Sequence, residues 1–327
     1  MLSVIQGRAM HVTRIRAGRE VPGLRQQHAA TLRALAQIFG AELRGGEVGS
    51  TEVSFSPGEP RVASATVDMK TAASITLLLQ AVIPAAALTR ASLTLELKGG
   101  TDVPWSPTFD YMESVAAKAY RLLGIDFTAK ATKRGYYPRG GGIVAAKVGP
   151  ATSVCPVVLG RAEGAASVEL VSRCARLPRH VAERQLESAE ALLISSGIRV
   201  ASKAVVEERA DSPGSSILAA DTGGGRVLGA DAIGARGKRA EEVGREVARK
   251  LLSALGSGAS VDANLADMIA PLLCIATGPS SLLVPEATLH LKTSLHVGRL
   301  FTGCDYALRQ EGSACLVDVG PAPGHNA

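Results

Sequence analysis

Histidine is scarce in this chain of 327 residues, and one of its six histidines, His290, stands where chemistry on a phosphate is favoured. It follows a strand pattern at residues 281–286 and enters a helical pattern at residues 289–301. The free amides and the dipole of a helix start attract anions. Imidazole has an ordinary pKa of about 6.5, so at neutral pH it is a nucleophile that needs no separate base. A half-buried helix histidine without a catalytic role fits this position equally well.

The most distinctive string in the chain is RGYYPRGGGIV, at residues 134–144. Its three successive glycines allow backbone amides to approach an anion closely, and Arg134 and Arg139 bracket them. A glycine bulge in a β-hairpin explains the same string without any ligand. Arg16 and Arg19 offer two further planar guanidinium groups suited to phosphate oxygens, although a solvated basic loop is the alternative there.

The composition limits which partners these residues serve. Lysine and arginine number 36 against 30 acidic residues, a net charge of +6, which permits a polyanionic partner without requiring one. Only 3% of residues are aromatic, so a broad platform for stacking single-stranded nucleic acid is excluded and contacts to RNA are expected through phosphates. Five cysteines without C-x-x-C spacing indicate neither a disulfide framework nor a zinc knuckle, and favour a reduced, cytoplasmic chain.

One uncharged apolar segment, at residues 71–89, is almost long enough to cross a bilayer. It contains Ser74, Gln80 and Pro84 and mixes small with large side chains. This pattern favours a helix buried on all sides within an α/β protein, and no membrane association is expected.

The elements that must position the candidate residues repeat along the chain. Strand patterns at residues 11–18 and 93–100 each end four residues before a proline, and each proline precedes a helical pattern, at residues 24–40 and 109–124. Two β-type stretches follow in both copies, and corresponding residues of the two copies are 82 positions apart. A partial third copy is predicted near the C-terminus. There, a helix at residues 265–277 is followed by the strand pattern at residues 281–286 and the helical pattern at residues 289–301. The first copy is expected to be incomplete, because the counterpart of residues 71–89 falls mostly before Met1.

A stretch of different character separates the second and third copies. Residues 161–260 predict a strand, a helix at 178–196, three further strands and a helix at 239–255. Residues 223–225, three glycines, are interpreted as a hairpin turn and not as a phosphate loop, since a strand pattern follows them directly. The sequence therefore predicts an α/β (α+β) protein. Its large domain consists of residues 1–160 and 261–327, built from repeated βαβαββ units, and residues 161–260 form an inserted small α/β domain.

The string at residues 134–144 resembles the signature of the RNA 3′-terminal phosphate cyclases, and further segments resemble that family in its order. These segments lie at residues 15–28, 47–58, 74–80, 98–107, 177–184 and 288–297. The resemblance covers essentially the whole chain. It implies an ATP-dependent ligase that converts an RNA 3′-phosphate end to a 2′,3′-cyclic phosphate, through a covalent histidine–AMP and an RNA adenylate. It also implies three related βαβαββ units with a smaller α/β insert.

The resemblance assigns expected roles to individual residues. His290 is the expected adenylylated residue. The expected nucleotide-binding residues are Gln80, Pro107, Tyr111, Asn264, Leu265, Ala266, Asp267 and Met268, with Tyr111 able to stack on a base. The expected RNA and phosphate ligands are Arg16, Arg19, His28, Arg134 and Arg139.

Two departures from the family pattern qualify these expectations. The family has a glycine-rich N-terminal segment with an acidic residue that holds a metal, and this sequence starts after it, so the ligands of the expected Mg²⁺ or Mn²⁺ are not identified. Asn264 and Met268 stand where the family more often has tyrosine and glutamine, which predicts weaker adenine contacts.

Two other functions fit parts of the sequence. One is a catalytically inactive, cyclase-like RNA-binding protein acting in ribosomal RNA processing; such relatives lack the histidine found at position 290. The other is a transferase similar to the enolpyruvyl transferases, which lack the string at residues 134–144.

Overall fold

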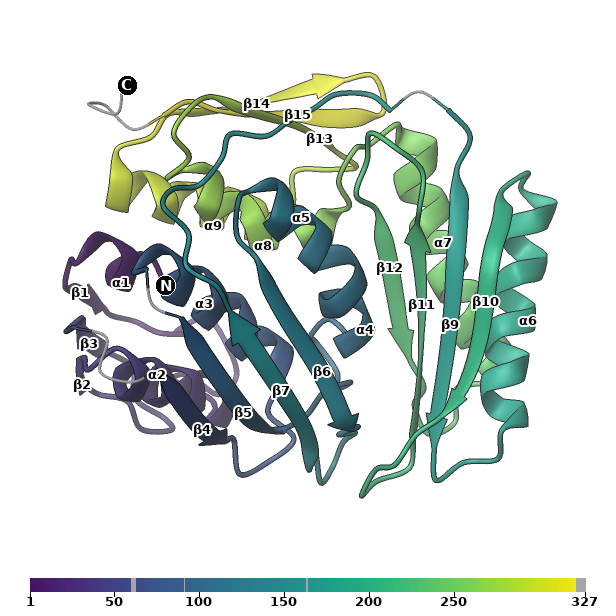
Figure 1. The fold of residues 1–327 in the computed structure, drawn as a ribbon, viewed down its shortest axis with the longest axis horizontal. Coiled ribbons are helices and arrows are strands. Elements are labelled where there is room, and N and C mark those ends of the chain that lie inside the picture. Colours follow the sequence, from purple (N-terminus) through teal and green to yellow (C-terminus); the bar gives the residue numbers. More distant parts are fainter. Residues whose placement is uncertain (60–62, 91, 163, 322–327) are drawn as a thin grey trace.

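The computed structural model describes residues 1–59, 63–90, 92–162 and 164–321. These residues form four β-sheets with helices packed against them, which establishes a mixed α/β protein (Figure 1). One sheet has three strands and the other three sheets have four.

The central sheet has the strand order β4-β5-β7-β6. Strands β4 and β5 are parallel, while β7 pairs antiparallel with both β5 and β6. Its strands are β4 (Ser64–Asp68), β5 (Leu93–Gly99), β6 (Phe127–Lys133) and β7 (Gly142–Val148). Helix α3 (Ile75–Leu88) connects β4 to β5, and three consecutive helical segments connect β5 to β6. These segments are α4 (Phe109–Tyr111), the π-helical turn η1 (Met112–Ala116) and α5 (Ala117–Leu122).

The C-terminal sheet has the corresponding order, β8-β13-β15-β14. Strands β8 and β13 are parallel, and β15 pairs antiparallel with both β13 and β14. Its strands are β8 (Val158–Leu159), β13 (Ser280–Val284), β14 (Tyr306–Glu311) and β15 (Ala314–Val319). Helix α8 (Ala263–Leu273) precedes β13, and α9 (Leu289–Thr302) connects β13 to β14. The two sheets therefore share both strand order and pairing sense.

The N-terminal sheet has three antiparallel strands in the order β1-β3-β2. They are β1 (Met10–Val12), β2 (Glu42–Arg44) and β3 (Val53–Ser56), with α1 (Leu2–Gln6) before β1 and α2 (Gln26–Ile38) after it. The strand predicted at residues 11–18 is therefore too long. Arg14 and Arg16 adopt positive φ angles of 56° and 53°, which a strand does not tolerate, so β1 ends before them.

The fourth sheet, in the order β10-β9-β11-β12, lies to the right of the central sheet in Figure 1. Strands β9 and β10 are parallel, and the remaining pairs are antiparallel. Its strands are β9 (Ser167–Ala175), β10 (Arg199–Glu207), β11 (Gly214–Asp221) and β12 (Gly229–Ile233), and it packs against α6 (His180–Ser195) and α7 (Ala240–Ser257). Residues 223–225 connect antiparallel β11 and β12, so the hairpin turn predicted there is confirmed.

Buried apolar side chains form two separate clusters. The smaller one lies between the fourth sheet, α6 and α7. The larger one joins the other three sheets, and α3 contributes Ile75, Leu78, Leu79 and Val82, all fully buried. The predicted helix at residues 71–89 is thus α3, surrounded by protein. Within the described parts of the chain, no helix combines the length and the apolar character needed to cross a membrane.

Arg134, at the end of β6, is the centre of a buried ionic network. Its Nη2 donates to Asp110 at 2.8 Å and its Nη1 donates to Asp102 at 3.3 Å. Arg173 of β9 donates to the other oxygen of Asp110 at 2.8 Å and also pairs with Glu208, so the network joins the central and fourth sheets. Burial alone would lower the pKa of Arg134, but the two carboxylates outweigh it and raise that pKa. The expected role of Arg134 as an RNA or phosphate ligand is therefore replaced by a structural one, because its guanidinium is buried and occupied.

The substitution Arg134→Met tests this structural role. Removing the central cation leaves the Asp102 carboxylate without its ion pair and leaves Asp110 paired with Arg173 alone, so the free energy of unfolding is expected to fall by about 3–5 kcal/mol, measured by urea denaturation. The control is Arg44→Met, which removes an ion pair to Glu42 whose arginine side chain is 78% exposed, and which should change stability little. Equal effects of the two substitutions would contradict the assigned role.

Candidate active site

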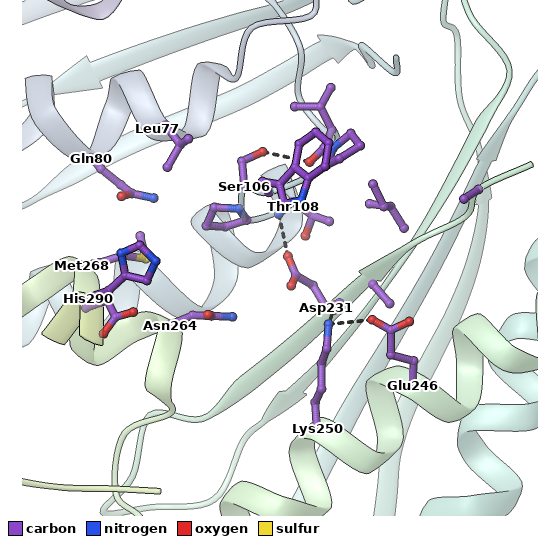
Figure 2. Close-up of a pocket in the computed structure, with 18 of the residues that line it drawn as sticks. Leu77, Gln80, Ser106, Thr108, Asp231, Glu246, Lys250, Asn264, Met268 and His290 are labelled. Atoms are coloured by element: carbon purple, nitrogen blue, oxygen red, sulfur yellow. Dashed lines mark hydrogen bonds and ion pairs between the residues drawn. The ribbon is translucent and has the colours of Figure 1, made fainter. Parts of the chain in front are cut away.

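A cavity of about 790 Å³ opens between the central, C-terminal and fourth sheets (Figure 2). Helices α3, α8 and α9 line one side, and β12 and α7 line the other. The segment between β5 and α4 lies at its rim. The lining residues are Leu77, Gln80, Val103, Pro104, Trp105, Ser106, Pro107, Thr108, Asp231, Ala232, Ile233, Ala235, Lys238, Glu246, Lys250, Asn264, Asp267, Met268, His290 and Ser294.

His290 lies in the first turn of α9, and its side chain is exposed to the cavity. The hydroxyl of Thr288 caps this helix by accepting the Leu291 N–H at 2.9 Å. The first amides of a helix have no partner within it and carry the positive end of the helix dipole. The imidazole of His290 is therefore accessible and lies beside amides suited to an anion.

Asp267 of α8 fixes the start of α9 next to His290. Its carboxylate accepts the hydroxyl of Thr288 at 2.6 Å, the same hydroxyl that caps α9. Burial raises the pKa of Asp267, opposed by this hydrogen bond and by the nearby His290. The link between Asp267 and Thr288 thus sets how α8 and α9 present their side chains to the cavity.

The opposite wall carries two lysines that were not predicted from the sequence. Lys250 donates to the backbone carbonyl of Asp231 at 2.9 Å and pairs with Glu246 at 2.8 Å, and Lys238 pairs with the same glutamate. An i,i+4 pair such as Glu246 and Lys250 is common on solvated helices, so the sequence carried no signal that this face borders a cavity.

Asp231 also joins β12 to the rim. Its buried carboxylate accepts the backbone N–H of Thr108 at 2.6 Å, and burial raises its pKa. The N–H of Thr108 is thereby satisfied at the point where α4 begins. This bond holds the segment that contains Pro107 against the fourth sheet.

Several residues expected to bind a nucleotide lie around this one cavity. Gln80 of α3, Pro107 at the rim, and Asn264, Asp267 and Met268 of α8 all line it together with His290. Figure 2 shows Gln80, Met268 and Asn264 on the same side as His290. Leu265 and Ala266 are fully buried on the core side of α8, so their side chains do not line the cavity.

Tyr111 was expected to line an adenine pocket, but the structure places it elsewhere. Its side chain is fully buried, and its hydroxyl donates to Asp262 at 2.7 Å. Asp262 also accepts the backbone N–H of Gly229 at 2.9 Å and of Leu265 at 3.0 Å. Burial raises the pKa of Asp262 to about 6, opposed by these three donors. Tyr111 therefore stabilises the frame of the cavity, and its ring has no face free for stacking.

Gly229 contributes to the same frame because it has no side chain. A Cβ atom at this position would lie 2.5 Å from Val115 and 3.1 Å from the ring of Tyr111. The close approach of β12 to η1 therefore requires glycine here.

The residues expected to bind RNA do not line the cavity. Arg16 donates to the Val21 carbonyl at 2.9 Å, while Arg19 and Arg139 are exposed. His28 accepts the N–H of Arg25 at 3.1 Å. Burial, together with the charges of Arg16 and Arg25, lowers the pKa of His28, so its neutral form is favoured.

A divalent metal expected from the resemblance finds no ready set of ligands in the described residues. Among residues 1–59, 63–90, 92–162 and 164–321, His, Cys, Asp and Glu side chains form no group of three or more that could hold a metal ion. The cavity carboxylates of Asp231, Glu246 and Asp267 already bind Thr108, Lys250 and Thr288. We therefore derive no step through a metal ion.

Comparison with known proteins places the chain in a family. The family model described as RNA 3′-terminal phosphate cyclase matches residues 1–308. Proteins named RNA 3′-terminal phosphate cyclase are similar to it. The one from Pyrococcus furiosus is 43% identical over 302 residues (92% of this chain, 87% of the relative), and the one from Methanopyrus kandleri is 39% identical over 327 residues (98% and 93%). The chain belongs to the RNA 3′-terminal phosphate cyclase family, whose members are ligase-type enzymes.

The substitution Tyr111→Phe tests the role of Asp262 in the frame. A hydrogen bond to a charged group contributes about 1.5–3 kcal/mol, so the variant should lose roughly that much free energy of unfolding. The tyrosine hydroxyl lowers the pKa of Asp262. That pKa should therefore rise further in the variant, and the stability deficit should grow as the pH rises through about 6, where the carboxylate ionises.

Urea denaturation at about pH 5 and about pH 8, on either side of this pKa, measures the effect. The control is Tyr120→Phe, because Tyr120 is equally buried and its hydroxyl has no partner in the described part of the chain. This control should show little loss at either pH. A loss in Tyr111→Phe that does not vary with pH would refute the proposed bond to an ionised carboxylate.

Proposed function

We propose that this protein converts an RNA 3′-terminal phosphate to a 2′,3′-cyclic phosphate with ATP, by way of an adenylylated His290. The observation that carries the proposal is the exposed position of His290 at the start of α9, in the same cavity as Gln80, Pro107 and Asn264. Family membership supports the choice of ATP and RNA as substrates.

The first step forms a bond between a ring nitrogen of His290 and the α-phosphorus of ATP. The bond from that phosphorus to the bridging oxygen breaks, and pyrophosphate leaves with the electron pair. The free amides at the start of α9 are suited to the charge on the phosphates. Lys238 and Lys250 on the opposite wall supply two further cations. Asp267 keeps α9 in position through Thr288, so that the ring stays in the cavity.

The second and third steps regenerate the enzyme and close the ring. An oxygen of the RNA 3′-phosphate attacks the same phosphorus, and His290 leaves, giving an RNA adenylate. The neighbouring 2′-hydroxyl then attacks the phosphorus of the RNA phosphate, loses its proton, and displaces AMP. Arg19 and Arg139 are exposed guanidinium groups suited to hold the RNA phosphates.

We also propose that the chain consists of three related βαβαββ units, with residues 161–260 inserted as a small α/β domain between the second and the third. The shared strand order of the central and C-terminal sheets supports this division, and so does the separate apolar cluster of the fourth sheet. Helix α1 lies where the offset of 82 residues places the C-terminal end of the counterpart of α3. We assign the reaction to the cytoplasm, which agrees with five free cysteines.

The substitution His290→Ala tests the nucleophile. After incubation with ATP labelled at the α-phosphate, the wild-type chain should carry acid-labile label, and His290→Ala should lose it by about a thousandfold or more, because no other group replaces the nucleophile. His296 lies on the same helix and is also exposed, so His296→Ala is the matched control and should be labelled normally. Absence of label in the wild type would favour an inactive RNA-binding scaffold.

The substitution Arg19→Ala tests how the RNA end is held. Loss of one charge-assisted hydrogen bond to phosphate should slow transfer of AMP to a 3′-phosphorylated oligoribonucleotide about tenfold or more, measured in a single turnover. Formation of the labelled enzyme should be unaffected, since Arg19 does not line the cavity. The exposed Arg44 serves as control, and Arg44→Ala should transfer AMP at the wild-type rate. Equal transfer rates in both variants would remove Arg19 from the RNA site.

A further inference from the structure

Trp105 is the single tryptophan of the chain and its side chain is 98% exposed. It lies at the rim of the cavity that contains His290. Aromatic side chains ordinarily bury 150–250 Å² each, so a tryptophan left wholly in water has given up a large apolar contribution to folding. Tyr137 is the other strongly exposed aromatic residue in the described part of the chain, and it does not line the cavity.

The surrounding segment fixes the position of Trp105, because the ring has almost no packing of its own. Both ends of the segment are anchored. Val103 is buried and accepts the hydroxyl of Ser106 at 3.0 Å, while Thr108 is buried and donates its N–H to Asp231. Trp105 itself has a φ of 62°, a left-handed conformation that is unfavourable for a residue other than glycine.

A strained backbone therefore presents a large flat ring to solvent beside the reactive histidine. Both the strained backbone and the exposed ring lower the stability of the folded protein, so neither is explained by a contribution to folding. Pro104 and Pro107 flank the ring and restrict the freedom of the segment further. The arrangement fits a ligand with a flat face that arrives from outside the cavity.

We propose that Trp105 stacks on the base of the last nucleotide of the RNA and so positions the 3′-phosphate for AMP transfer. The proposal rests on the function proposed above. Stacking on an aromatic side chain is tolerant of sequence because every base has a π-face. The scarcity of aromatic residues, 3% of the chain, limits this mode to one base and leaves the remaining RNA contacts to phosphates.

The adenine of ATP is a less suitable partner. Pockets for small ligands bury about 70–90% of the ligand, so their aromatic residues are enclosed by the walls. A ring that is 98% exposed at the rim is open to a ligand that extends beyond the cavity, as a polymer does. Trp105 is accordingly assigned as a residue that positions RNA and not as part of the nucleotide pocket.

The single tryptophan makes the test direct, since tryptophan fluorescence reports on position 105 alone. The full chain is titrated, without ATP, with an oligoribonucleotide that ends in a 3′-phosphate, and with the same oligonucleotide lacking the base of its last nucleotide. The complete oligonucleotide should quench the fluorescence and bind about tenfold more tightly than the abasic one. A non-hydrolysable ATP analogue with a methylene group between its α- and β-phosphates should leave the fluorescence unchanged.

Three variants separate stacking from folding. Trp105→Gly suits the positive φ, so its unfolding temperature should not fall, but it should bind the complete and abasic oligonucleotides equally, about tenfold more weakly than wild type binds the complete one. Trp105→Phe keeps a ring and should retain part of the preference for the complete oligonucleotide. Val158→Ala removes an exposed apolar side chain from β8 and should behave as wild type.

Labelling by ATP distinguishes failure of this inference from failure of the proposed function. The inference is wrong if the wild type binds both oligonucleotides equally, or if the ATP analogue alone quenches the fluorescence, even when His290 is labelled normally. If the wild type takes up no label, the proposed adenylylation fails. The comparison of the two oligonucleotides still decides whether Trp105 stacks on RNA.

Discussion

The geometry of the cavity depends on one buried carboxylate, that of Asp262. It accepts hydrogen bonds from Tyr111, Gly229 and Leu265, which belong to three different parts of the chain. Each donor is close in sequence to residues that line the cavity: Tyr111 to residues 103–108, Gly229 to residues 231–233, and Leu265 to residues 264–268. Burying a carboxylate is unfavourable unless it is well hydrogen-bonded. Moving any of the three donors away would therefore cost free energy, and this cost keeps them together. The raised pKa of Asp262, about 6, reflects how strongly burial opposes its charge.

Two further sets of polar contacts add to this frame, one at Asp231 and one around Arg134. Asp231 fastens the rim to β12 through the N–H of Thr108, and the network around Arg134 joins the central sheet to the fourth sheet through Asp110 of α4. Because these contacts are buried, water screens them little. His290 lies outside this frame, exposed in the first turn of α9.

Much of the fold could be predicted from periodicity and turn residues. The helices α2, α3, α6, α7 and α9 lie close to the ranges expected. The segment of α3 is apolar on all sides, and the other four have an apolar face of helical period and recognisable ends. The placement of His290 at a helix start was also predictable, because a strand and a proline precede it. The prediction of a strand over residues 11–18 was wrong, because Arg14 and Arg16 have positive φ. Neither position holds glycine or asparagine, the residues whose presence would have indicated positive φ.

The roles of Tyr111 and Arg134 could not be obtained in this way. Each has a chemical group that suits a ligand as well as a buried partner, and the partners, Asp262 and Asp102 with Asp110, are brought to them only by folding. Lys238 and Lys250 were missed for the converse reason, since an ordinary charged helix surface and the wall of a cavity have the same sequence pattern.

The missing side chain of Gly229 has an evolutionary consequence. A single added methyl group would force β12 away from η1, and Asp231, two residues further along, would move with the strand and release the rim. Position 229 is therefore constrained to glycine, although it does not line the cavity. A descendant that acquired alanine there would need a compensating smaller residue at position 115, in place of Val115, to keep the same architecture.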